Sequence, residues 1–197
     1  MTYSIDRDDR LAAFSETWSV FANANGGVAL DPAWLTGRVI WDFISDSTTV
    51  HLYQVMVQRV RREGQPITFQ FRCDAPDRRR LLEMAMTPGP AGAVQFIVTP
   101  VRDEPRPPVS LLSAARPTGS GLISMCAWCK RVHTGGGAWI EVEAAIDALG
   151  LFHARHLPRV SHGICPSCQT AMLRLTGQAA AGPGMLTLGP LPGDDGA

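Results

Sequence analysis

The sequence has 197 residues, a formal net charge of zero and only 18% charged residues. This length can hold one ordinary domain and a smaller one, and the neutral balance argues against a protein held on nucleic acid by a strong positive field. No apolar run reaches the roughly 18 residues of a membrane span, and no apolar stretch precedes the charged residues 6–10, so we expect a cytoplasmic protein without a secretory signal.

Residues 1–102 are predicted to form an α+β domain. Alternating apolar residues predict strands at residues 3–5, 11–14, 67–73, 82–86 and 94–98. Capping residues predict helices after Ser15, after Asp31 and near residue 47. The last and longest carries Val50, Tyr53, Val57 and Val60 on one stripe and ends at Gly64. We therefore expect a five-stranded antiparallel sheet with helices on one face.

The remaining chain divides into three segments by composition. Residues 103–121 are rich in proline and are predicted to be a linker without regular pairing. Residues 122–176 contain most of the cysteines and are predicted to form a separate small module. Residues 177–197 are rich in Gly, Pro and Ala and are predicted to be a disordered tail.

Four cysteines of the small module have the spacing of a metal site. Cys126 and Cys129 form one C-x2-C pair, and Cys165 and Cys168 form a second. Two such pairs supply the four thiolates of a tetrahedral zinc site, so we predict a structural Zn²⁺. An iron–sulfur cluster and metal-free thiols or disulfides are the alternatives, the disulfides being disfavoured in a reducing compartment.

The residues around these cysteines predict how the site is built. Pro166 and the helical pattern of residues 169–175 place the second pair at a helix N-terminus. The glycine-rich residues 134–137 predict a hairpin between residues 130–133 and 138–141. This arrangement resembles treble-clef zinc modules, although Lys130 stands where many of them have glycine.

A four-thiolate zinc site carries net negative charge, which nearby donors can offset. Lys130, Arg131 and His162 are predicted to surround the thiolates in this way. His133 could replace a ligand in principle, but four cysteines already complete a tetrahedron.

The chain also resembles bacterial PAS-domain sensory proteins with a cysteine-containing tail. The likeness covers about residues 3–102 and 124–175 and rests on the segments 3–10, 37–44, 71–78, 126–131 and 161–168. A PAS domain has the same order of elements: two strands, short helices, one longer helix and three antiparallel strands. The resemblance implies sensing or signalling without catalysis, frequent dimers, and a cavity for a small ligand between sheet and helices.

The ligand of such a cavity is left unknown by the sequence. The Asn-Cys-Arg-Phe motif of flavin photosensors of this family is absent, and Cys73 is interpreted as a small core residue. His51 on the long helix is the candidate ligand-binding residue, since haem-binding members commonly use a histidine there.

Our functional hypothesis is a cytoplasmic signal-transduction or regulatory protein, not an enzyme, whose zinc module docks a protein partner and which could form a homodimer. No nucleophile–base constellation or catalytic motif is readable. The alternatives are a zinc-thiolate redox switch and a transcriptional regulator that binds nucleic acid through the zinc module.

Two groups of arginines could form a basic patch for nucleic acid, but we expect them to pair with nearby acids. The groups are Arg59, Arg61 and Arg62, and Arg78, Arg79 and Arg80.

Overall fold

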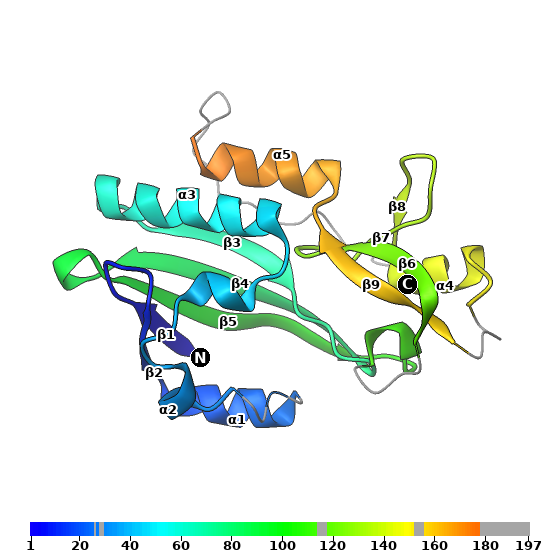
Figure 1. Ribbon diagram of the computed structural model, residues 1–197, viewed down its shortest axis with the longest axis horizontal. Helices are drawn as coiled ribbons and strands as arrows, with labels where there is room; N and C mark the ends of the chain where they lie inside the picture. The colour runs from blue at the N-terminus through cyan, green and yellow to red at the C-terminus, as the bar shows by residue number, and fades with distance from the viewer. Residues whose placement is uncertain (26, 28–29, 114–117, 152–155, 178–197) are drawn as a thin grey trace.

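The first part of the chain forms a five-stranded antiparallel sheet (Figure 1). The computed structural model describes residues 1–25, 27, 30–113, 118–151 and 156–177. The sheet order is β2-β1-β5-β4-β3, with β1 (Thr2–Ile5), β2 (Leu11–Phe14), β3 (Ile67–Arg72), β4 (Arg78–Pro88) and β5 (Val94–Pro105). The short turn η2 (Pro90–Gly92) joins β4 to β5. The predicted α+β class and antiparallel sheet are confirmed, whereas the predicted disordered tail lies, apart from Gly177, outside the described residues.

The helices of this part lie between β2 and β3 in the chain. They are α1 (Glu16–Ala24), α2 (Pro32–Leu35), the 3₁₀ turn η1 (Ile40–Phe43) and α3 (Ser47–Glu63). The Asp46 carboxylate caps α3 by accepting a hydrogen bond from the Thr49 amide at 2.7 Å. Gly64 ends the helix in the left-handed conformation, with φ of 65°.

The buried face of α3 differs from the predicted stripe. Val57 and Val60 are buried as expected, but Leu52 and Met56 are buried beside them and Val50 is only partly buried. The helix is rotated in this way because the sheet beneath it offers apolar contacts to both Leu52 and Met56.

The second part of the chain forms a curled, mixed sheet. Its order is β8-β7-β6-β9, with β6 (Thr118–Cys126), β7 (Val132–His133), β8 (Trp139–Ile140) and β9 (Leu157–Gly163). The helix α4 (Val142–Ala148) lies between β8 and β9, and α5 (Pro166–Leu175) ends the described chain. The predicted glycine hairpin is β7–β8, and Gly135, Gly136 and Gly137 all adopt positive φ in its turn. The parallel pairing of β6 with β9 was not predicted.

The segment predicted as a linker contains regular structure. β5 continues through Asp103 and Glu104, which pair with β4, and its last residue Pro105 sits at a strand end, where a missing N–H is tolerated. The turn η3 (Ser110–Leu112) follows, and Val109 and Leu111 are buried against the second sheet. The apolar side chains among the prolines therefore anchor this segment.

The two parts share one apolar core. The four cysteines and Trp128 belong to the same buried cluster as α3 and the five-stranded sheet, while a smaller cluster lies around β6, β7 and α4. Helix α5 lies alongside α3 (Figure 1). The cysteine site therefore lies against the first domain.

Candidate metal centre and adjoining cavity

The four predicted cysteines converge on one point. Their sulfur atoms all lie within 4.8 Å of one another, and the exposed fraction of each residue is 7% or less. The Sγ atoms of Cys129 and Cys165 are 3.7 Å apart. A tetrahedron with metal–sulfur bonds of about 2.3 Å has edges of about 3.8 Å. The four sulfurs therefore fit a metal ion such as Zn²⁺, and all four cysteines are free of disulfides.

The first pair lies on a tight turn that follows β6, which we call the first knuckle (residues 126–131). The Lys130 amide donates to the Cys126 carbonyl at 3.0 Å, and the Cys126 amide donates to the Arg131 carbonyl at 2.8 Å. Closing the turn places Lys130 at φ of 61°, a conformation that glycine adopts without strain. The lysine therefore occupies this turn at a conformational cost that glycine would not pay.

The second pair lies where β9 leads into α5. Cys165 is the N-cap of α5, Pro166 occupies its first turn, and Cys168 lies one turn along, as predicted. The Cys165 amide donates to the Cys126 sulfur at 3.5 Å, and the Ser167 hydroxyl lies 3.2 Å from the Cys165 sulfur. Such donors stabilise negative charge on sulfur.

The electrostatics of the cluster favour thiolate at two of the four positions. A hydrogen bond from Cys129 lowers the pKa of Cys126 to about 7. Hydrogen bonds from Cys126, Cys129 and Cys168 lower the pKa of Cys165 as well. Hydrogen bonds from Cys126 raise the pKa of Cys129 and Cys168 instead. Since metal binding needs thiolates, a metal ion that binds all four sulfurs must displace protons from these two.

The residues predicted to surround the thiolates differ in what they do. Arg131 contributes its backbone carbonyl, while its guanidinium donates to Glu141 at 3.2 Å. His162 lies exposed on β9, and in the described part of the chain it makes no hydrogen bond to a cysteine. Lys130 turns its amine to the Ala127 carbonyl at 3.1 Å instead of to a sulfur.

The two other histidines considered from the sequence belong neither to the four-cysteine cluster nor to the lining of the cavity described below. His133 packs against Trp139 in the hairpin, with ring centroids 5.2 Å apart. His51 is on α3, as predicted, but it is exposed and does not line the cavity described below. Its position gives no support to a ligand-binding role.

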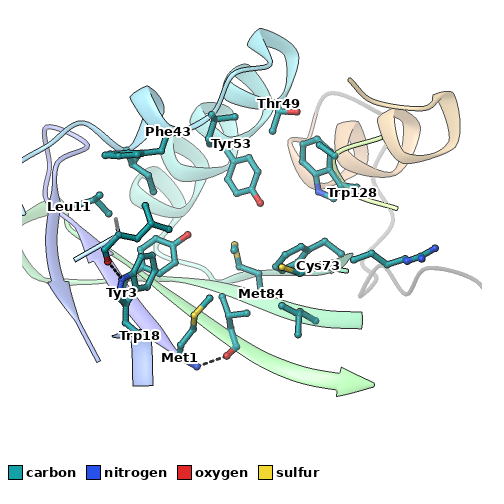
Figure 2. A pocket seen from close by; sticks show the side chains of 18 of the residues that line it. Met1, Tyr3, Leu11, Trp18, Phe43, Thr49, Tyr53, Cys73, Met84 and Trp128 are labelled. Carbon is teal, nitrogen blue, oxygen red and sulfur yellow. Dashed lines mark hydrogen bonds between the residues drawn. The ribbon is translucent and has the colours of Figure 1, made fainter. Parts of the chain in front are cut away.

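A cavity of about 370 Å³ lies between α3, η1 and the first sheet (Figure 2). Its wall is mostly apolar and includes Leu11, Phe43 and Met84. One end of the wall is built by the first knuckle, through Ala127, Trp128 and Lys130. Cavities of this size fall in the range of small-molecule sites. The residues between and after two metal ligands therefore also border a candidate binding site.

The polar groups of the cavity wall are mainly hydrogen-bond donors. Burial raises the pKa of both Tyr3 and Tyr53 well above the ordinary value. Trp128 is 2% exposed, stacks on Tyr53 with ring centroids 5.7 Å apart, and its indole N–H has no partner in the described structure. Burial lowers the pKa of Lys130, against the opposing influence of Cys73 and Asp74. Cys73, predicted as a core residue, is half-buried in the same wall.

A buried ion-pair network joins the first sheet to the second part of the chain. The fully buried Arg72 pairs with Asp74 and with Glu141 at the start of α4. Arg106 pairs with Asp74 at 3.1 Å and with Glu143 at 3.1 Å. The Arg72 amide also donates to the Trp128 carbonyl at 2.7 Å. The sequence analysis missed this network, because the paired residues Arg72 and Glu141 are 69 positions apart and no local pattern connects them.

The arginines considered as a basic patch make internal contacts, as expected. Arg59 pairs with Glu63 at 2.8 Å and also donates to the Leu175 carbonyl at the end of α5 at 2.8 Å. Arg61 pairs with Asp9 at 2.8 Å. The other members pair as follows: Arg62 with Glu63, Arg78 with Asp103, Arg79 with Glu143, and Arg80 with Asp103.

Comparisons with known proteins add no assignment. No protein-family model matches this chain, and no curated protein matches it. Among the helices of the described ranges, none has the length and apolar character needed to cross a membrane.

Proposed function

We propose that this chain is a signalling or regulatory protein in which a PAS-like domain binds a small molecule and a structural zinc module carries the response to a partner. The observation that carries the proposal is the double role of the first knuckle. Cys126 and Cys129 belong to the metal cluster, while Ala127 and Trp128 between them line the cavity. A ligand that moves Trp128 therefore acts on the metal site within one turn of chain.

The PAS-like assignment is supported by the element order and by the place of the cavity. The elements follow one another in the order two strands, short helices, one long helix and three antiparallel strands. The cavity lies between the helices and the sheet. Zinc is favoured over an iron–sulfur cluster, because four sulfurs within 4.8 Å of one another fit a single ion.

Neither alternative function gains a specific observation. A redox switch needs accessible thiols, and the four cysteines are buried. A nucleic-acid binder needs a basic surface, and the arginines considered for it are paired with acids.

Two measurements test the proposal. Elemental analysis of protein purified without added metal should give about one zinc per chain, and Cys168→Ser should lose most of it. Hydrogen exchange of the zinc-loaded chain is then compared with and without the neutral apolar dye N-phenyl-1-naphthylamine. We expect one dye per chain and slower exchange in the first knuckle and in α5 as well as in the cavity wall.

The control is Cys73→Trp, which places a large side chain in the cavity wall at a residue outside the four-cysteine cluster. This variant should bind less dye and should not show slower hydrogen exchange in the first knuckle and α5 when dye is added, while its zinc stays bound. If bound dye slowed hydrogen exchange only within residues 1–102, coupling to the zinc module would be refuted. Light scattering of the same sample tests the simplest partner, a second copy of the chain.

A further inference from the structure

The wall of the cavity has an unbalanced set of polar groups. Its lining residues include no Asp or Glu. Within the described chain, the hydroxyls of Tyr3 and Tyr53 make no hydrogen bond, and the indole N–H of Trp128 is buried without a partner. Thr49, by contrast, donates its hydroxyl to Asp46 at 2.6 Å and is satisfied. A buried donor without a partner is costly, so the wall favours a ligand that brings acceptors.

The unpartnered donors face the interior of the cavity. Figure 2 shows the Tyr53 ring extending from α3 with its hydroxyl between Tyr3 and Trp128, and the nitrogen-bearing edge of Trp128 turned toward the same space. The indole N–H of Trp128 does not form a hydrogen bond with bulk water, because the residue is 2% exposed. The indole nitrogen is closed off from water in this structure, so an acceptor on a ligand reaches its N–H when Trp128 or a neighbouring side chain shifts.

Lys130 adds positive charge at the same end of the wall. Its amine makes one hydrogen bond, to the neutral Ala127 carbonyl, and no carboxylate of the described residues lies within ion-pair distance. Lys130 is also the only lysine in a sequence that otherwise uses arginine. Arg72, the other cation of the wall, is already paired with two carboxylates.

The rest of the wall is suited to an aromatic body. Besides Tyr3, Tyr53 and Trp128, the cavity is bordered by Trp18, Phe43 and Phe71. Aromatic rings pack favourably against one another in stacked or edge-on geometry. At about 370 Å³, the cavity limits the ligand to a small molecule.

We propose that the cavity binds a small aromatic carboxylate, with its carboxylate accepting hydrogen bonds from Trp128 and Lys130 and its ring lying among the aromatic side chains. The inference rests on the proposed sensing function and specifies the ligand class of the same site. Binding at this end places the carboxylate on the first knuckle, beside the metal cluster.

The test uses three probes of one shape on the zinc-loaded chain: naphthalene-2-carboxylate, naphthalene-2-carboxamide and 2-naphthylmethylamine. Calorimetry should give the carboxylate at least about tenfold tighter binding than the amide, the gain expected of charge-assisted hydrogen bonds. The amine should bind most weakly. Bound carboxylate should also protect Lys130 from reductive methylation, which mass spectrometry can follow without interference from other lysines.

Three variants localise the carboxylate. Lys130→Met and Trp128→Phe should each weaken carboxylate binding about fivefold or more, and Lys130→Met should leave amide binding nearly unchanged. The control variant Arg38→Met removes an exposed cation that lies over Trp34, outside the cavity. It should change the affinity for neither the carboxylate nor the amide. Zinc content and melting temperature verify that each variant is folded.

The outcomes separate this inference from the proposed function. Equal affinity for amide and carboxylate, or undiminished binding by Lys130→Met, overturns the ligand class while the cavity still binds a ligand. Absence of binding by all three probes overturns the inference outright. Carboxylate binding without any change in exchange at the first knuckle or α5 supports the ligand class and overturns the coupling that the proposed function requires.

Discussion

Replacing Arg72 by methionine tests how strongly the two parts of the chain are held together. The Arg72 and Asp74 side chains are both 0% exposed, and Arg72 also pairs with Glu141 across the junction. Burial opposes the charge of Arg72, but its two carboxylate partners outweigh that effect and raise its pKa. Methionine keeps the apolar stem of the side chain and removes the charged guanidinium, so the main effect is an uncompensated buried carboxylate.

The magnitude follows from what Asp74 retains. Removing one partner of a buried ion pair costs about 3–5 kcal/mol. Asp74 keeps Arg106 at 3.1 Å and the Arg80 amide at 3.1 Å, so we expect the lower end, about 3 kcal/mol. For a chain of this length each kcal/mol shifts the melting temperature by roughly 2–4 °C, which predicts a loss of about 6–12 °C.

The assay is thermal and denaturant unfolding of the zinc-loaded protein, with zinc content measured on the same sample. The matched control is Arg78→Met, since Arg78 and its partner Asp103 are each 40% exposed and such a pair contributes at most about 1 kcal/mol. Arg72→Lys, which keeps the charge but loses the two-pronged geometry, should fall between the two. A loss for Arg72→Met no larger than that of Arg78→Met would refute the reasoning.

Three further predictions concern backbone conformation and ionisation. Because Lys130 has a φ of 61°, Lys130→Gly should be more stable than Lys130→Ala by about 1 kcal/mol in denaturant unfolding, and equal stabilities would contradict the left-handed turn. Gly64→Ala, at a φ of 65° with nothing near its missing Cβ, should cost about 1 kcal/mol by the same measurement. The two tyrosines of the sequence, Tyr3 and Tyr53, have pKa values raised above the ordinary 10.0 by burial. The folded state keeps both hydroxyls protonated, so their contribution to stability is fully present below pH 10 and falls progressively above it. Absorbance at alkaline pH should therefore show phenolate only together with unfolding. Phenolate formation near pH 10 in the folded protein would contradict the burial of these tyrosines.

The parts that the sequence predicted correctly depend on short-range patterns. The spacing of Cys126 to Cys129 and of Cys165 to Cys168 needs only a few residues to be recognised. The same is true of the glycine turn between β7 and β8 and of Gly64 at the end of α3. These local signals were enough to predict the cluster and the antiparallel sheet, because turn and cap chemistry constrain the backbone directly.

The parts that could not be predicted depend on tertiary contacts. The buried face of α3 shifted toward Leu52 and Met56, since several apolar residues compete for the same stripe and the sheet decides among them. The prolines of residues 103–121 suggested a linker, yet Val109 and Leu111 are buried by a sheet whose strands lie later in the chain. The parallel pairing of β6 with β9 likewise joins residues separated by β7, β8 and α4.

The position of Trp128 gives these separate observations a common consequence. Trp128 lies between Cys126 and Cys129 of the cysteine cluster, and its ring stacks on Tyr53 of α3. Its carbonyl accepts a hydrogen bond from the Arg72 amide at the edge of the first sheet. The cysteine cluster thus holds one wall of the cavity, and the ion-pair network holds the strand beside it. Since cores are closely packed, a ligand that displaces Trp128 must also strain the knuckle or the network. This is why the proposed response is expected at the zinc module and not only around the ligand.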